Sequence, residues 1–290
     1  MKQIFTLFFL VFLSFSPFLL RGSTCTWTGA AGDNNWNNNA NWSCGAVPTT
    51  VDDVVISNVT VTAPTATVQS LSLNNATLTI TSSSIFTVSM NVNIQNSNIV
   101  GGSLSFNNLT VPVGSNLNLT DASLHSSDMA TIATLTNNGT LVLNGSLLYG
   151  ADVTIINNGL LDVPENASIY NGTTPSFTVV STINNTATGE IRITKGYTFA
   201  PTICGSGLIN VLSTATLDYF QMDLRFCEGI TPTFTMAANA KVRCFATSFG
   251  GTISIGTGAE LYISGSGDCT ATITGAGNAT FDGNINFKAV

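Results

Sequence analysis

Hydrophobic and polar residues alternate in short runs along most of this chain. From Val54 onward, a run of the form apolar-x-apolar is followed by a polar turn, and another apolar residue comes seven or eight positions after the first. The recurrences that fit this pattern are Leu71/Leu73 with Leu78, Leu161/Val163 with Ile169, Ile191/Ile193 with Phe199, Ile209/Val211 with Leu217, and Ile253/Ile255 with Leu261. Alternation with a period of two predicts β-strands that bury one face and expose the other.

One phrase occurs twice near the middle of the chain. Residues Thr136–Leu143 read TNNGTLVL, and residues Ile156–Val163 read INNGLLDV, 20 positions further on. A turn that feeds a short strand and recurs at such a period is typical of a solenoid, in which each strand stacks on its copy in the next coil. The recurring pattern starts at 141, 161, 191, 209 and 253, which indicates coils of about 22 residues, some longer loops and one skipped copy.

These patterns predict an all-β fold, a parallel β-helix of roughly eleven coils between Val54 and Val290. The chain has 290 residues, and 44% of them are hydrophobic, which is enough for a well-buried core. No stretch after the first 22 residues shows a helical period, and we expect no second domain.

The first 22 residues have the layout of a secretory signal peptide. Lys2 precedes an apolar run from Ile4 to Phe15, and Pro17 and small residues follow. An uncleaved membrane anchor is the alternative, although Pro17 interrupts the run. The predicted organisation is a signal peptide (1–22), an N-terminal cap segment (23–53) and a β-helix domain (54–290). We therefore expect a secreted or cell-surface protein with no later membrane span.

The stretch 27–56 differs in amino-acid composition from the rest of the chain. It holds all three Trp residues, Trp27, Trp36 and Trp42, among Asn and Gly residues, and a Gly, a Pro and an Asp then precede a β-branched strand. This order resembles the opening segment of autotransporter-like and other secreted β-helix passengers. The resemblance implies that the β-helix is right-handed and that a Trp-rich segment begins it. Cys25 and Cys44 depart from that pattern, which leaves the export route open.

Six cysteines remain after the predicted signal peptide, and an even number in a secreted chain is typical of disulfides. Residues one coil apart lie about 4.8 Å apart, a separation that a disulfide can bridge. Two spacings, of 23 and 25 residues, are close to one coil, and one pair is left to pin the cap. The predicted pairs are Cys204 with Cys227, Cys244 with Cys269, and Cys25 with Cys44.

Charged residues make up only 8% of the chain, and the formal net charge is −7. Without Lys2 and Arg21 of the signal, six basic residues face fifteen acidic ones. This balance repels phosphate backbones, so we expect no nucleic-acid partner. The cysteine spacings lack the paired C-x₂-C of a zinc site, and neither a metal nor a cofactor is expected.

Eleven Asn-x-Ser/Thr sequons are a mild excess over chance for this composition. If the source organism glycosylates Asn, several should carry a glycan; otherwise they are turn residues. The candidate positions are Asn41, Asn58, Asn75, Asn108, Asn118, Asn138, Asn144, Asn166, Asn171, Asn184 and Asn278.

Few residues indicate chemistry. Trp27, Trp36 and Trp42 either stack on sugar rings or plug the open end of the core, and their place in the cap favours plugging. The adjacent carboxylates Asp52 and Asp53 suit Ca²⁺ or acid–base catalysis, but beside a turn they more simply accept bonds from backbone amides.

The sequence predicts a non-enzymatic extracellular surface or matrix protein that acts in adhesion or wall association. Extracellular polysaccharide or another surface protein is the expected partner. The first alternative is a lectin-like module that binds polysaccharide through the Trp residues or a groove beside the stack. The second is a polysaccharide lyase or hydrolase, because such enzymes share the β-helix. For that alternative the densest charged window is Asp218, Asp223, Arg225 and Glu228.

Overall fold

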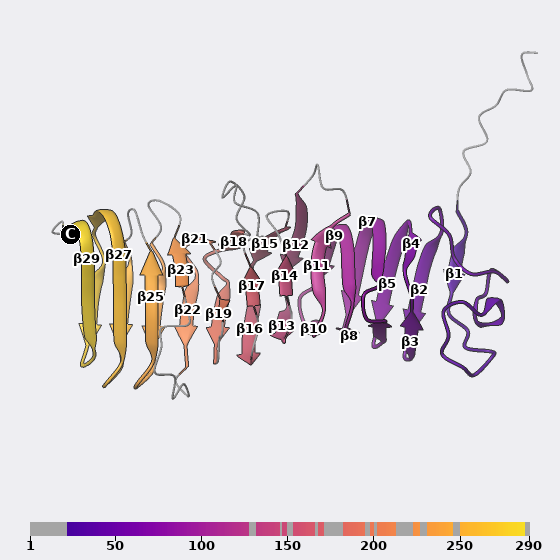
Figure 1. The fold of residues 1–290 in the computed structure, drawn as a ribbon, viewed down its shortest axis with the longest axis horizontal. Helices are drawn as coiled ribbons and strands as arrows, with labels where there is room; N and C mark the ends of the chain where they lie inside the picture. Colours follow the sequence, from indigo (N-terminus) through magenta and orange to yellow (C-terminus); the bar gives the residue numbers. More distant parts are fainter. Residues whose placement is uncertain are drawn as a thin grey trace, which may run out of the picture.

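The computed structural model describes residues 22–127, 132–145, 147–149, 153–165, 168–170, 182–194, 198–199, 202–212, 223–226, 231–245 and 250–287. These residues form an elongated stack of strands, along which the chain advances from the indigo N-terminal end to the yellow C-terminal end (Figure 1). Their strands pair in parallel, and their one helix is the short 3-10 helix η1 (Asn39–Asn41). The protein is therefore an all-β parallel β-solenoid, as predicted.

One sheet consists of 11 strands, and each inner strand pairs with the strands of the preceding and following levels of the stack. In order, these strands are β3 (Thr60–Ala63), β6 (Thr77–Ile80), β8 (Ser97–Val100), β10 (Asn116–Thr120), β13 (Thr140–Asn144), β16 (Leu160–Glu165), β19 (Glu190–Ile193), β22 (Leu208–Val211), β24 (Thr233–Met236), β26 (Thr252–Ile255) and β28 (Thr272–Gly275).

The other sheet has 18 strands and contains two ladders, which share the long strands β7 (Ile85–Gln95) and β9 (Ser103–Val111). The first ladder holds β1 (Thr24–Thr26), β2 (Asp53–Ser57), β5 (Ser70–Asn74), β12 (Ala133–Asn137), β15 (Val153–Asn157), β18 (Thr182–Asn185), β21 (Thr202–Gly205), β23 (Asp223–Phe226), β25 (Lys241–Phe245), β27 (Glu260–Cys269) and β29 (Asn278–Phe287). The second holds β4 (Ala66–Val68), β11 (Ser123–Ser126), β14 (Leu147–Tyr149), β17 (Ser168–Tyr170) and β20 (Thr198–Phe199).

The register of the 11-stranded sheet confirms the recurring apolar pattern. Leu141 pairs with Leu161, and the same row continues through Ile191 and Ile209. The copy that the sequence pattern skips is Phe234, which lies between Ile209 and Ile253 in the same row. The sequence pattern missed this level because it carries an aromatic residue in an otherwise aliphatic row. The spacing between the pattern starts at 209 and 253 therefore spans two levels.

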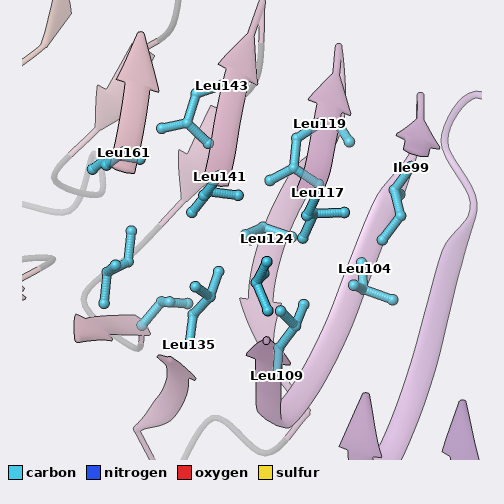
Figure 2. Close-up of a cluster of buried hydrophobic side chains, with 14 of the residues drawn as sticks. Ile99, Leu104, Leu109, Leu117, Leu119, Leu124, Leu135, Leu141, Leu143 and Leu161 are labelled. Atoms are coloured by element: carbon cyan, nitrogen blue, oxygen red, sulfur yellow. The ribbon is translucent and has the colours of Figure 1, made fainter. Parts of the chain in front are cut away.

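Inward-facing side chains form one continuous core. Leu117, Leu141 and Leu161 are each fully buried on successive levels, and Leu109 and Leu135 from the other sheet face them across the interior (Figure 2). Burying one such side chain stabilises the folded state by about 1.5–3 kcal/mol. Because each level packs only on its neighbours, this core stabilises the stack level by level.

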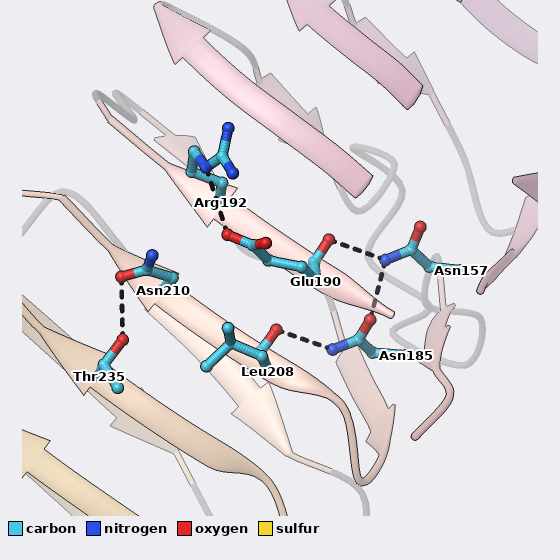
Figure 3. Close-up of polar contacts among 7 residues, drawn as sticks. All are labelled: Asn157, Asn185, Glu190, Arg192, Leu208, Asn210 and Thr235. Atoms are coloured by element: carbon cyan, nitrogen blue, oxygen red, sulfur yellow. Dashed lines mark hydrogen bonds and ion pairs between the residues drawn. The ribbon is translucent and has the colours of Figure 1, made fainter. Parts of the chain in front are cut away.

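The repeated Asn-Asn-Gly phrase has a structural cause. Its first Asn lies inside the stack, where Asn137, Asn157 and Asn185 are register partners on successive levels and are buried. The side-chain amide of Asn157 donates to Oδ1 of Asn185 at 2.8 Å and to the backbone oxygen of Glu190 at 3.0 Å (Figure 3). The buried amides therefore hold successive levels together at the turn.

The Gly of the same phrase allows close packing between levels. A Cβ added at Gly159 would lie 2.2 Å from the backbone oxygen of Gly139, and one added at Gly139 would lie 2.2 Å from that of Ser115. Only Gly fits where backbones approach so closely. The phrase thus specifies an inner ladder and a tight turn together.

The N-terminal segment extends the stack and seals it. Strand β1 pairs with β2 in register, so the first strand of the sheet belongs to the cap segment. Trp36 and Trp42 are in edge contact at 4.6 Å between ring centroids, and Trp36 contacts Phe86 of the core at 5.0 Å. Aromatic edge contacts of this kind stabilise beyond their buried area. The Trp residues plug the open end of the core.

Asp52 ties the start of the folded chain to this cap. Its Oδ1 accepts from the backbone and the hydroxyl of Ser23 at 2.8 and 2.9 Å, and its Oδ2 accepts from the backbone and the hydroxyl of Thr49 at 2.8 and 2.7 Å. Burial by itself raises the pKa of Asp52, but these hydrogen bonds outweigh it and hold the pKa below its ordinary value. Asp52 therefore binds turn amides, as expected.

The cysteines confirm one predicted pair and contradict another. Cys25 and Cys44 form a disulfide with a Cα separation of 5.1 Å. Cys269 is free and buried, so its predicted bond to Cys244 is wrong. In register Cys244 faces Ile263, and Cys269 lies six residues further along the ten-residue strand β27. A spacing of 25 residues therefore did not correspond to one level.

Cys204 is disulfide-bonded. Cys227 lies outside the described residues, so the pair of Cys204 with Cys227 stays a prediction.

Candidate functional site

The three Trp residues do not form an exposed surface. Trp27, Trp36 and Trp42 are 7%, 1% and 3% exposed, and the indole nitrogen of Trp42 donates to the backbone oxygen of Trp36 at 2.8 Å. A sugar ring needs an open aromatic face, and these faces pack on each other and on the core. The burial corrects the alternative that Trp27, Trp36 and Trp42 bind a ligand and agrees with the favoured interpretation, in which they plug the end of the core.

A groove lies on the outer face of the 18-stranded sheet, at strands β2, β5 and β7. Figure 1 shows these strands near the N-terminal end of the stack. We call this site the flank groove; its volume is about 570 Å³. Two rows of outward side chains cross its floor, one residue per strand in each row. The rows are Val55, Ser72 and Asn93, and Ser57, Asn74 and Gln95.

The wall of the flank groove is a longer connection than its neighbours. Residues 112–115 join β9 to β10, whereas two residues, 75–76, join β5 to β6, and one residue, 96, joins β7 to β8. The longer connection places Pro112 and Val113 beside the floor, and Val113 is 83% exposed. Pro112 and Val113 thus give the depression an apolar side next to its polar floor.

The polar side chains of the floor have unused hydrogen-bonding capacity. Within the described residues, Ser57, Ser72, Asn74, Asn93 and Gln95 make no side-chain hydrogen bond, and the buried Oδ1 of Asn74 has no partner. Outward Asn residues elsewhere do pair between levels, as the amide of Asn118 does with Oδ1 of Asn98 at 2.8 Å. Buried amide oxygens without partners are rare in folded proteins. The polar side chains of the floor are thus neutral and, apart from the buried Oδ1 of Asn74, open to solvent.

The 11-stranded sheet carries a second polar surface, which we call the polar face. It is one outward row that runs the full length of the sheet, and eight of its eleven members carry a hydroxyl or an amide. The row consists of Thr60, Thr77, Asn98, Asn118, Val142, Asp162, Arg192, Asn210, Thr235, Ser254 and Thr274. Thr235 donates to Oδ1 of Asn210 at 2.9 Å (Figure 3).

The charges on this face lie together at its centre. Arg192 contacts Glu190 at 3.2 Å (Figure 3). It lies beside Asp162 in the row. Burial raises the pKa of Asp162; Arg192 opposes this shift and Glu190 adds to it. A partly exposed pair of this kind contributes little stability, so the group mainly balances its own charge.

The residues considered for catalysis are only partly described. Asp223 and Arg225 lie on β23, whereas Asp218 and Glu228 lie outside the described residues. Among the described residues, no group of three or more His, Cys, Asp or Glu side chains is placed to hold a metal ion.

The sequons differ in accessibility. Asn58, Asn75, Asn108, Asn144, Asn184 and Asn278 are exposed, Asn118 and Asn138 are half-buried, and Asn166 and Asn171 lie outside the described residues. Asn41 is fully buried, and its amide donates to Oδ1 of Asp33 at 2.6 Å and to the backbone oxygen of Asn35 at 3.1 Å. A glycan on Asn41 is incompatible with this cap, so that candidate is corrected.

Comparison with known proteins gives one match. Residues 26–101 match a family described as Domain of unknown function (DUF8693). This span covers the cap and the strands that form the floor of the flank groove, and it ends before the wall at 112–115. No curated protein and no solved structure matches the chain. None of the helices in the described part of the chain is long and apolar enough to cross a membrane.

Proposed function

We propose that this protein is a secreted, non-enzymatic surface or matrix protein that works by adhesion or wall association. The observation that carries the proposal is the polar face, an outward row along the whole 11-stranded sheet in which hydroxyl and amide side chains lie on both sides of a central charged group. Each such group offers a hydrogen-bond donor and an acceptor, and polysaccharide hydroxyls need both. A rigid stack repeats these groups at a spacing of about 4.8 Å, which suits many weak contacts along one polymer.

Three further features support an extracellular setting. The first 22 residues have the layout of a signal peptide, the cap is pinned by the Cys25–Cys44 disulfide, and the opening segment resembles that of secreted β-helix passengers. Six sequons are exposed on the stack. The same features fit a passenger displayed at the cell surface.

Adhesion can be tested with the purified mature chain on insoluble material. We expect retention on at least one of cellulose, chitin and isolated cell wall, with little loss in 1 M NaCl because the contacts are hydrogen bonds between neutral groups. The double variant Asn210→Lys/Thr235→Lys should weaken retention, whereas Thr136→Lys, on the outer face of the other sheet, should not. Absence of retention on every material would refute adhesion. Release of reducing ends from pectin would instead support an enzyme.

A carbohydrate-binding module is the second candidate, and the flank groove favours it. The groove gives a ligand both a floor and a wall to contact, which an extended face does not.

A further inference from the structure

We propose that the flank groove is a binding subsite for a short stretch of a neutral oligosaccharide. This inference rests on the proposed function in one respect, since it assumes that the partner of the protein is a polysaccharide. It goes beyond that function because it assigns the contact to one place and names the side chains that make it.

The chemistry of the floor selects the ligand class. The polar residues that line it are Ser, Asn and Gln, and no lining residue carries a charge. A phosphate, a carboxylate or an ammonium group would find no ion-pair partner there. Hydroxyl and amide side chains each donate and accept, so they match a ligand that also does both at many positions. Sugar hydroxyls have that property.

The backbone of the floor is already in use, which argues against a peptide strand. Val55 pairs with Ser72, and Ser72 with Asn93, so the main-chain groups of the floor belong to the ladder between levels. Strand addition needs a free sheet edge, and β5 has a partner on each side. Recognition in the flank groove must therefore come from side chains.

The groove has a polar floor and an apolar wall, which suit the hydroxyl groups and the C–H groups of a sugar. The side-chain amides of Asn74, Asn93 and Gln95 line the floor, and those of Asn93 and Gln95 are exposed and make no hydrogen bond among the described residues, so both can donate to and accept from a sugar. Pro112 and Val113 supply an apolar wall against which C–H groups can pack. The floor crosses three levels, a length of about 10 Å, which fits about two hexose units.

The wall is the feature that distinguishes this part of the sheet from the neighbouring levels. Connections 58–59, 75–76 and 138–139 contain two residues, and the connection 112–115 contains four. Removing Val113 and Gly114 would therefore restore the length used at neighbouring levels and open the groove. The neighbouring levels show that the fold accepts a two-residue connection at this position.

Isothermal titration with cello-, chito-, xylo- and manno-hexaose tests this inference on the full mature chain. We expect at least one probe to bind, and we expect Asn93→Ala/Gln95→Ala and the deletion of residues 113–114 each to weaken it at least about ten-fold. Thr136→Ala, an outward residue further along the same sheet, is the matched control and should bind as the parent does. Unchanged circular dichroism and melting would show that the variants fold.

Two results would overturn the inference. Either no hexasaccharide binds the parent protein, or binding persists unchanged in both groove variants. Retention on cell wall, measured in parallel with the same variants, separates the two proposals: retention that survives in the groove variants leaves adhesion standing and removes the flank groove alone.

Discussion

The side-chain amide of Asn137 donates a 2.8 Å hydrogen bond to Oδ1 of Asn157, its register partner one level along the stack. The two residues occupy the same position in the two copies of the repeated phrase. Equivalent residues of the sequence repeat are therefore in direct contact. Because both are buried, the pair is protected from water and holds the turns in register.

We expect Asn157→Ala to destabilise the protein by about 2–4 kcal/mol, since it removes the middle of the ladder, leaves Oδ1 of Asn185 without its donor in the interior, and takes one of two acceptors from the amide of Asn137. Asn158→Ala is the matched control. Asn158 is half-buried, donates to Oδ1 of Asn138 and accepts from the hydroxyl of Thr186, and water can replace both partners, so its loss should cost less, about 1 kcal/mol. Urea unfolding followed by circular dichroism measures both; equal losses would contradict the role of the inner ladder.

The Cys25–Cys44 disulfide should stabilise the cap more than the rest of the stack. It closes a loop of 19 residues, for which chain entropy predicts about 3 kcal/mol. All three Trp residues lie in the cap, so their fluorescence reports on the cap alone. In Cys25→Ser/Cys44→Ser we expect the Trp emission to shift to the red at a lower temperature than the loss of the β-sheet signal. A single coincident transition, at the melting temperature of the parent, would contradict this prediction.

The architecture could be predicted because each level of a solenoid is encoded by a short, recurring segment of the sequence. Alternation shows which residues face inward, and a row such as Leu141, Leu161 and Ile191 needs only a constant offset per level. Disulfide pairing could not be predicted in the same way for Cys269, because the ten-residue strand β27 shifts the relation between sequence spacing and level.

The flank groove could not be predicted from the sequence, for a different reason. Ser57, Asn74 and Gln95 look like ordinary outward residues, and they become one row only when the register is known. The one signal in the sequence was the connection 112–115, which is longer than the turns around it and carries an apolar residue where Asn and Gly are usual. A break in a repeat is thus the place to look for a site.

The cap should also respond to acid through Asp52. Hydrogen bonds from Ser23 and Thr49 hold the pKa of Asp52 below its ordinary value in the folded state, so the folded protein retains the carboxylate at a pH where the unfolded chain binds a proton. The stability that this carboxylate contributes is therefore fully present above the unfolded value of about 3.9 and is lost as the pH falls through the lower folded value.

Asp52→Asn should lower the stability of the cap at neutral pH and flatten its dependence on acid below about pH 4. Trp fluorescence during thermal melting at a series of pH values from 7 to 2.5 measures both effects. Asp53→Asn is the matched control, because Asp53 lies next in the chain and its side chain takes no part in the clamp between Ser23 and Thr49. If Asp52→Asn loses stability in acid as steeply as the parent, another group sets the acid response of the cap.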